Sequence, residues 1–306
     1  MRTTPSITAT DSGYPHSLPV GSTPPGAESS AFEGRGNSSL RGQLSAFAWL
    51  GHIRPAEERQ AGTGSADSFD ELARMAVDEP WDRFSPAERD SLAVLKHYVT
   101  WTFEQSLVTS SVVPSPDSQT CVFNTRLVTP QHEFIYGVFQ PNRQAGRQDW
   151  YLAGWRVAGT RQLETYTELP EGASYSQDPH AYVFDWDLPV TFVARQFTSM
   201  VSSLFPAALR EIPLGLELAL EGAVNRAIDI AKRNPGTAVP AWQPGKAELQ
   251  LLLPLYLANP ATPDAALVIS RGDMAYRSTA IVSLADAYKA ARLVTRPTAH
   301  WLNPPM

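Results

Sequence analysis

Apolar residues recur every three or four positions in several segments, which is the spacing of a helix with one buried face. The clearest pattern covers about residues 215–233 and stops at 234–236 (Asn-Pro-Gly), a sequence that ends helices. A capping box begins at Ser68, and residues 85–88 (Ser-Pro-Ala-Glu) give a stronger start signal for a helix over roughly 86–106. Helical spacing also occurs in residues 190–205 and roughly 284–293.

Short runs of β-branched and aromatic residues predict strands in two parts of the chain. In the first part, the predicted helix is followed by a strand, a turn at 114–118 and a second strand around Cys121, an order compatible with the start of a winged helix. In the last part, three runs with short polar links predict an antiparallel sheet: residues 249–257, 265–269 and 280–283. No regular alternation of strands and helices occurs. The sequence therefore predicts an α+β fold with helices packed on a mainly antiparallel sheet.

The beginning of the chain has a different composition. Residues 1–40 contain 23 Gly, Pro, Ser or Thr residues, and such a segment cannot bury enough apolar area to offset the entropy lost on ordering. It also lacks the basic start and the apolar stretch of a signal peptide. We expect a disordered tail over 1–43, either an inert leader or an arm that docks on a partner. One globular domain follows over 44–303, with a sub-boundary near 160–205.

The overall charge narrows the classes of ligand. The 306 residues include 25 Lys or Arg and 31 Asp or Glu, a formal net charge of −6, so the chain is a poor candidate for a non-specific polyanion binder. Residues 205–306 hold 10 basic and 8 acidic residues, which makes this part the better place for an anion. The single cysteine, Cys121, excludes an intrachain disulfide and a multi-cysteine zinc site, and we expect it to be a buried strand thiol. No apolar run approaches the roughly 20 residues of a membrane helix, so we expect no membrane partner and a cytoplasmic location.

Motifs that bind phosphate, nicotinamide cofactors, zinc or calcium are absent, and we expect no cofactor. Asp185 and Asp187 lie two residues apart, so on a strand their carboxylates would share a face and could hold a divalent cation together with Glu221. Such a set would serve a metal-assisted phosphodiesterase or hydrolase. In the alternative interpretation, the two aspartates form a turn and a helix cap.

Basic and aromatic residues gather in the last third of the sequence. Arg226 and Arg233 lie seven residues apart on one predicted helix, so they share a face. Arg292 and Arg296 lie on or just past the final helix, near Tyr288. Arginine beside aromatic residues can hold a nucleotide or a single RNA strand by stacking and charge-assisted hydrogen bonds. The alternative is two solvated helix ends.

Three groups of segments match one known family in order and spacing. They are residues 123–129 with 134–136 and 139–142, residues 220–224 with 238–240 and 251–255, and residues 264–268 with 287–293 and 300–302. On these segments the sequence resembles the domain of unknown function 3825 family over about 44–303. The resemblance implies no established activity. It implies an RNA context, because relatives are sometimes joined to small RNA-binding modules such as LOTUS-type winged helices or cold-shock domains.

Some positions depart from the pattern of this family. Arg126 stands where glycine usually follows Asn-Thr, and Ala290 stands where asparagine is usual. Pro235 and Gly236 replace a Tyr-Lys pair, and Ala285 replaces an aspartate. If the missing lysine, aspartate and asparagine carry out chemistry in relatives, this chain has lost it.

These observations predict an RNA- or nucleotide-binding pocket as the main function. Its expected ligand-binding residues are Asn124, Thr125, Arg226, Arg233, Tyr288 and Arg292. Asn124 and Thr125 could instead close a turn, and Arg292 could instead pair with Glu221 in the core. Two other functions stay open: the metal-assisted hydrolase, and a scaffold whose tail recruits an unidentified protein partner.

Overall fold

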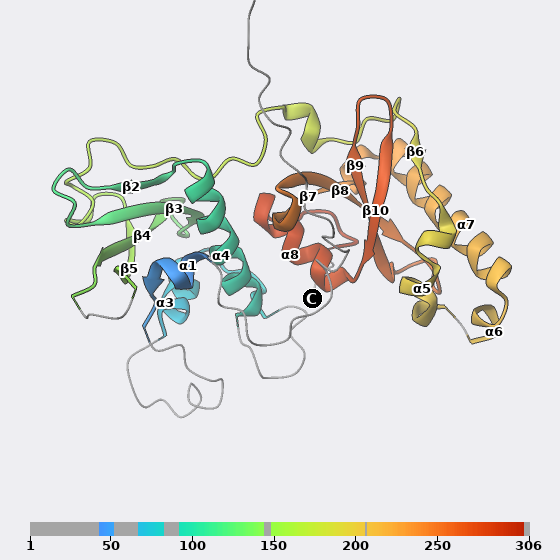
Figure 1. The fold of residues 1–306 in the computed structure, drawn as a ribbon, viewed down its shortest axis with the longest axis horizontal. Coiled ribbons are helices and arrows are strands. Elements are labelled where there is room, and N and C mark those ends of the chain that lie inside the picture. Colours follow the sequence, from blue (N-terminus) through green and yellow to red (C-terminus); the bar gives the residue numbers. More distant parts are fainter. Residues whose placement is uncertain (1–42, 52–66, 83–91, 144–147, 206, 303–306) are drawn as a thin grey trace, which may run out of the picture. The chain divides into compact units, whose positions relative to one another are not determined.

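Two β-sheets dominate the architecture of the protein (Figure 1). The computed structural model describes residues 43–51, 67–82, 92–143, 148–205 and 207–302. Each sheet has five strands, of which four are antiparallel and one is a parallel strand at an edge. Helices pack on the sheets, so the predicted α+β class is confirmed, with two sheets sharing the strands. The predicted tail and the helix start at 85–88 lie outside the described residues, apart from residue 43.

The first sheet has the strand order β1-β5-β4-β3-β2. In that order the strands are Ala48–Trp49, Trp150–Val157, Phe134–Pro141, Cys121–Val128 and Val112–Pro114. The accompanying helices are α1 (Gln43–Phe47), α3 (Ser68–Met75) and α4 (Ala93–Val108). Phe103 of α4 packs edge-on against Phe123 and Phe139 of the sheet. The predicted order of helix, strand, turn and strand is confirmed by α4, β2 and β3, and β3 is an inner strand of this larger sheet.

Helix α3 begins next to the residue that the sequence pattern indicated. The N-cap is Asp67, whose side chain accepts a hydrogen bond from the backbone N–H of Phe69 at 3.0 Å. Ser68, the predicted cap, is the first helical residue, and its hydroxyl donates to the carbonyl of Leu50 at 3.1 Å. Aspartate and serine are both favoured caps, so the neighbouring aspartate takes the role.

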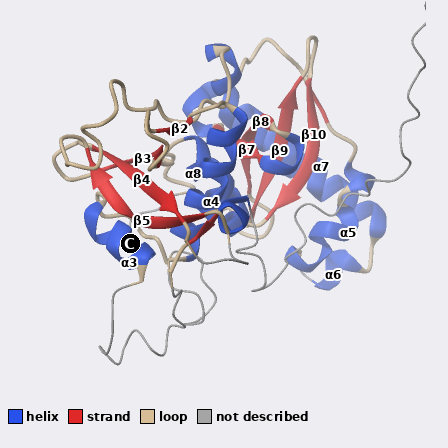
Figure 2. Cartoon of the chain, turned by 60° about the vertical axis from the view of Figure 1, so that its left-hand side comes forward, coloured by secondary structure: helices blue, strands red, loops and turns tan. Residues whose placement is uncertain are grey.

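The second sheet has the strand order β6-β10-β9-β8-β7. In that order the strands are Val190–Thr191, Tyr276–Val282, Ala265–Arg271, Glu248–Leu255 and Val239–Gln243. Leu251 and Leu253, alternate residues of β8, share a buried cluster with Leu220 and Val224 of helix α7 (Pro213–Arg233). Helix α8 (Leu284–Val294) contacts β7 and β9, and Figures 1 and 2 show it on the other side of the sheet from α7. Both helices and strands β8 to β10 agree with the predicted segments.

The connection between the sheets is mostly irregular. The chain leaves the first sheet at Val157 and enters the second at Val190, within the predicted sub-boundary. The helix predicted over 190–205 is broken, because β6 takes its start and only α5 (Thr198–Val201) is α-helical; α6 (Ala207–Arg210) follows. The 3-10 turns are Pro179–Tyr182, Ala194–Gln196, Ser202–Leu204, Pro235–Thr237 and Pro244–Lys246. Among the described residues, no helix combines the length and the hydrophobicity needed to cross a membrane.

Candidate functional site

The structure does not bring the predicted ligand-binding residues into one site. Arg226 and Arg233 lie on α7, whereas Tyr288 and Arg292 lie on α8, on the opposite face of the second sheet. The guanidinium of Arg226 stacks on the ring of Tyr256 at 4.9 Å, and Arg233 is exposed. Tyr288 is buried in the core. The predicted combination of the two helices in one pocket is therefore corrected, because the sheet separates them.

Asn124 and Thr125 are buried and serve the backbone. The side-chain N–H of Asn124 donates to the carbonyl of Pro170 at 3.3 Å, and its Oδ1 accepts from the backbone N–H of Arg126 at 2.8 Å. The hydroxyl of Thr125 donates to the carbonyl of Ile135 at 2.6 Å. Of the two interpretations that the sequence left open, these contacts show the turn. Here the register between β3 and β4 shifts, so the two residues shape a bulge.

The bulge presents Arg126, which the sequence analysis noted only as a departure from glycine. Its backbone has φ +59°, in the left-handed region that favours glycine, so a usual glycine at this position has a physical reason. The side chain runs over Gly172, where an added Cβ would lie 2.3 Å from its Cγ. Nη1 donates to the carbonyl of Ala173 at 3.2 Å, and the guanidinium stacks on Tyr175 at 5.6 Å. A strained backbone with a well-packed cation is typical of functional sites.

Arg292 forms a buried ion pair with Glu79. Its Nε and Nη2 donate to the two carboxylate oxygens at 2.7 and 2.8 Å, and both side chains are 7% exposed. The guanidinium also lies over the rings of Tyr98 at 4.3 Å and Trp81 at 5.4 Å. Burial alone would lower the pKa of Arg292, but Tyr98 and Glu79 outweigh it and raise the pKa above its ordinary value. Arg292 is thus a fixed cation, and its acidic partner is Glu79, not Glu221.

Arg126 and Arg292 meet at one cavity of about 340 Å³. Segments far apart in the sequence line it: the chain after α3, the middle of α4, the β3 bulge and the end of α8. Its charged and aromatic lining residues are Glu79, Tyr98, Arg126, His132, Arg292 and Arg296. We call this cavity the arginine pocket. Three arginines against one glutamate leave its lining with a positive surplus of two charges when His132 is neutral.

Two helix ends oppose this positive charge. Helix α3 ends at Met75 and α8 ends at Val294, both beside the arginine pocket. A helix C-terminus carries roughly half a negative charge, whose effect falls off within the last turn. Three full positive charges outweigh two such ends and one carboxylate. The pocket therefore favours an anion.

Two titratable side chains near the pocket stay neutral at pH 7. Burial, followed by Tyr98, raises the pKa of Tyr175 to about 12, against the opposing effect of Arg126 and Arg292. Burial, followed by Lys289, lowers the pKa of His97 in α4 to about 3. A neutral phenol and a neutral imidazole leave the positive charge of the pocket unchanged.

The residues proposed for a metal centre do not form one. Oδ2 of Asp185 accepts from Arg271 Nη2 at 2.9 Å, and its Oδ1 accepts from the backbone N–H of Asp187 at 3.1 Å, so the two aspartates form a turn. Glu221 is exposed on α7. The part of the chain that the structure describes holds no group of three or more His, Cys, Asp or Glu residues suited to a metal ion. Cys121 is buried in β3, as predicted, and burial raises the pKa of its thiol to about 11.

The sequence interpretation missed Glu79, Tyr98 and Arg126. Glu79 and Arg292 are 213 residues apart, so no local spacing links them. Tyr98 has a hidden role, because its hydroxyl donates to the Thr125 carbonyl at 2.8 Å while its ring faces Arg292. A signal did exist for Arg126: an arginine where the resembled family usually has glycine.

Comparison with known proteins gives one result. A family model described as "Domain of unknown function (DUF3825)" matches residues 72–301, which include every charged lining residue of the arginine pocket. No match was found among curated proteins or among solved structures.

Proposed function

The chain belongs to the domain of unknown function 3825 family, and from the geometry of its arginine pocket we propose that it binds a phosphate-bearing ligand, a nucleotide or an RNA strand. The observation that carries the proposal is the meeting of Arg126, Arg292 and Arg296 at one cavity with a single acid, Glu79. Arginine presents a planar fork of donors that matches phosphate oxygens.

The magnitudes favour an anion in this setting. Two unit charges about 4 Å apart interact by about 4 kcal/mol at the effective dielectric constant of a protein surface. A helix C-terminus typically contributes only about 0.3–1 kcal/mol. Arg292 is already oriented by Glu79, while Arg126 is partly exposed and Arg296 is exposed. The last two cations can therefore approach a phosphate without breaking the buried ion pair.

The net charge of the chain limits how much nucleic acid it can contact. A formal charge of −6 disfavours a long track of phosphate contacts. One cavity of about 340 Å³ instead accommodates one phosphate group and its immediate neighbours. We therefore expect the affinity to depend weakly on salt, with a logarithmic slope of about −1 to −3. The RNA context implied by the family resemblance fits a strand that is gripped at a single point.

Fluorescence anisotropy with a short labelled RNA tests the proposal, with a nucleoside monophosphate as competitor. We expect saturable binding that weakens by at least about tenfold in the variant Arg126→Gln/Arg296→Gln, because two charge-assisted contacts are lost. Circular dichroism checks that this variant is folded. Arg292 is left intact, because its removal would strand the buried Glu79.

The matched control is Arg226→Gln/Arg233→Gln on α7, which removes the same charge from the opposite face of the second sheet. It should bind like the wild type. No saturable binding by the wild type, or equal losses in both double variants, would reject the arginine pocket as the site. Competition by the monophosphate would identify a nucleotide-sized ligand.

A further inference from the structure

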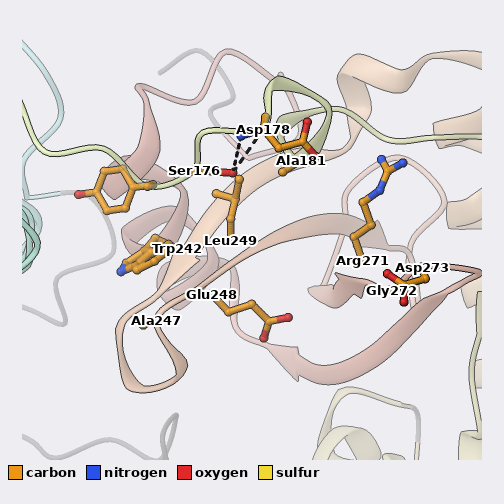
Figure 3. Close-up of a pocket in the computed structure, with 11 residues that line it drawn as sticks. Ser176, Asp178, Ala181, Trp242, Ala247, Glu248, Leu249, Arg271, Gly272 and Asp273 are labelled. Atoms are coloured by element: carbon orange, nitrogen blue, oxygen red, sulfur yellow. Dashed lines mark hydrogen bonds between the residues drawn. The ribbon is translucent and has the colours of Figure 1, made fainter. Parts of the chain in front are cut away.

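A second cavity, of about 590 Å³, lies along the second sheet. Its walls come from the loop at residues 175–178, from β7 and β8, and from the turn after β9 (Figure 3). The charged and aromatic lining residues are Tyr175, Asp178, Trp242, Glu248, Arg271 and Asp273. We call this cavity the acidic groove.

One end of the acidic groove is aromatic. Tyr175 and Trp242 pack edge to face with their ring centroids 5.0 Å apart. Figure 3 shows the hydroxyl of Tyr175 directed away from the opening, so the ring faces the groove. Leu249 and Ala247 extend the apolar surface. An aromatic wall of this kind attracts an organic cation through the electrons of its rings.

The rest of the groove carries a negative surplus. Figure 3 shows the carboxylates of Asp178, Glu248 and Asp273 on different sides of one opening. The one lining cation, Arg271, already pairs with Asp185 at 2.9 Å and donates to the carbonyl of His180 at 3.3 Å. Its charge is therefore largely neutralised, whereas the three lining carboxylates face the groove.

We propose that the acidic groove binds the guanidinium group of an arginine side chain from a partner protein. Charge complementarity excludes a phosphate here, and the described residues hold no cluster that could bind a metal ion. A planar guanidinium stacks on aromatic rings and donates to carboxylates in its own plane, which a compact ammonium does less well. The aromatic end and the separated carboxylates of the groove match both properties.

The test is an NMR titration of the full chain with the peptide Ac-Ala-Arg-Ala-NH2. The signal is the indole N–H of Trp242, assigned with the variant Trp242→Phe. We expect a saturable shift. The citrulline peptide, which has the same shape and no charge, should bind at least about tenfold more weakly, and the lysine peptide should lie between the two.

Two variants locate the binding. Glu248→Gln/Asp273→Asn should weaken binding of the arginine peptide by at least about tenfold. The control Asp229→Asn removes one exposed carboxylate on α7 and should bind like the wild type. The proposal is overturned if the arginine peptide gives no saturable shift, if the citrulline or lysine peptide binds equally well, or if the double variant retains full affinity.

Discussion

The arginine pocket and the acidic groove share a wall but carry opposite charge. Arg126 lines the pocket and stacks on Tyr175, which lines the groove. The pocket has three arginines against one glutamate, and the groove has three carboxylates against one arginine. A chain with a net charge of −6 thus contains two local fields of opposite sign. Net charge describes association with a long polyanion, but it does not describe either cavity.

The two cavities also use their ion pairs differently. The pair between Arg292 and Glu79 at the pocket has side chains that are 7% exposed, whereas Arg271 and Asp185 at the groove are 32% and 33% exposed. Breaking a buried pair leaves a charge without a partner or water, but an exposed charge can be hydrated again. We infer that the first pair is needed for the fold and that the second mainly positions a loop.

The largest expected effect comes from breaking the buried pair. Glu79→Gln leaves the guanidinium of Arg292 buried without its counter-ion, and we expect a loss of about 3–5 kcal/mol in the free energy of unfolding. Urea denaturation measures this loss. The matched change at the groove, Asp185→Asn, should cost less than about 1 kcal/mol, because both partners are partly hydrated.

A second variant separates charge from packing. Glu79→Gln/Arg292→Met removes both charges and should recover most of the stability lost in Glu79→Gln. Equal destabilisation by Glu79→Gln and Asp185→Asn would show that burial does not distinguish the two ion pairs.

The next effect concerns the shared wall at high pH. The pKa of Tyr175 is raised to about 12, mainly by burial, from an ordinary value near 10. Its contribution to stability is full below pH 10 and is lost as pH rises towards 12, because the unfolded chain ionises first. A shift of two units corresponds to about 2–3 kcal/mol.

The variant Tyr175→Phe measures this contribution. It removes the ionisable group, so its free energy of unfolding should fall less steeply than that of the wild type between pH 10 and 12. The matched control, Tyr151→Phe, changes a partly exposed tyrosine of the first sheet. If Tyr175→Phe and the wild type have the same pH profile, Tyr175 ionises as freely in the folded chain as in the unfolded chain.

Local patterns in the sequence predict much of the fold and little of the site. Helices α7 and α8 follow from helical spacing, and strands β8 to β10 follow from apolar runs between polar links. The region 190–205 is wrong as one helix, because pairing of Val190 with Tyr276 depends on a strand 86 residues later. The pairing of Arg292 with Glu79 is even less local. Spacing finds residues that share an element, but a cavity is made where distant elements meet.

The smallest effect distinguishes strain from binding at Arg126. Its φ of +59° is strained for every residue except glycine. Arg126→Gly should therefore be more stable than Arg126→Ala by about 1 kcal/mol, since both lose the stack on Tyr175 but only glycine relieves the backbone. Thermal or urea denaturation of the two variants gives this difference.

Both variants should lose affinity for RNA equally, by about tenfold, because both lack the guanidinium that lines the arginine pocket. The acidic groove should keep its affinity for the arginine peptide in both. If instead RNA affinity followed stability, with glycine binding better than alanine, the backbone of the bulge and not the charge of Arg126 would determine binding. Stability and affinity that vary independently would assign the strain to the fold and the charge to the ligand.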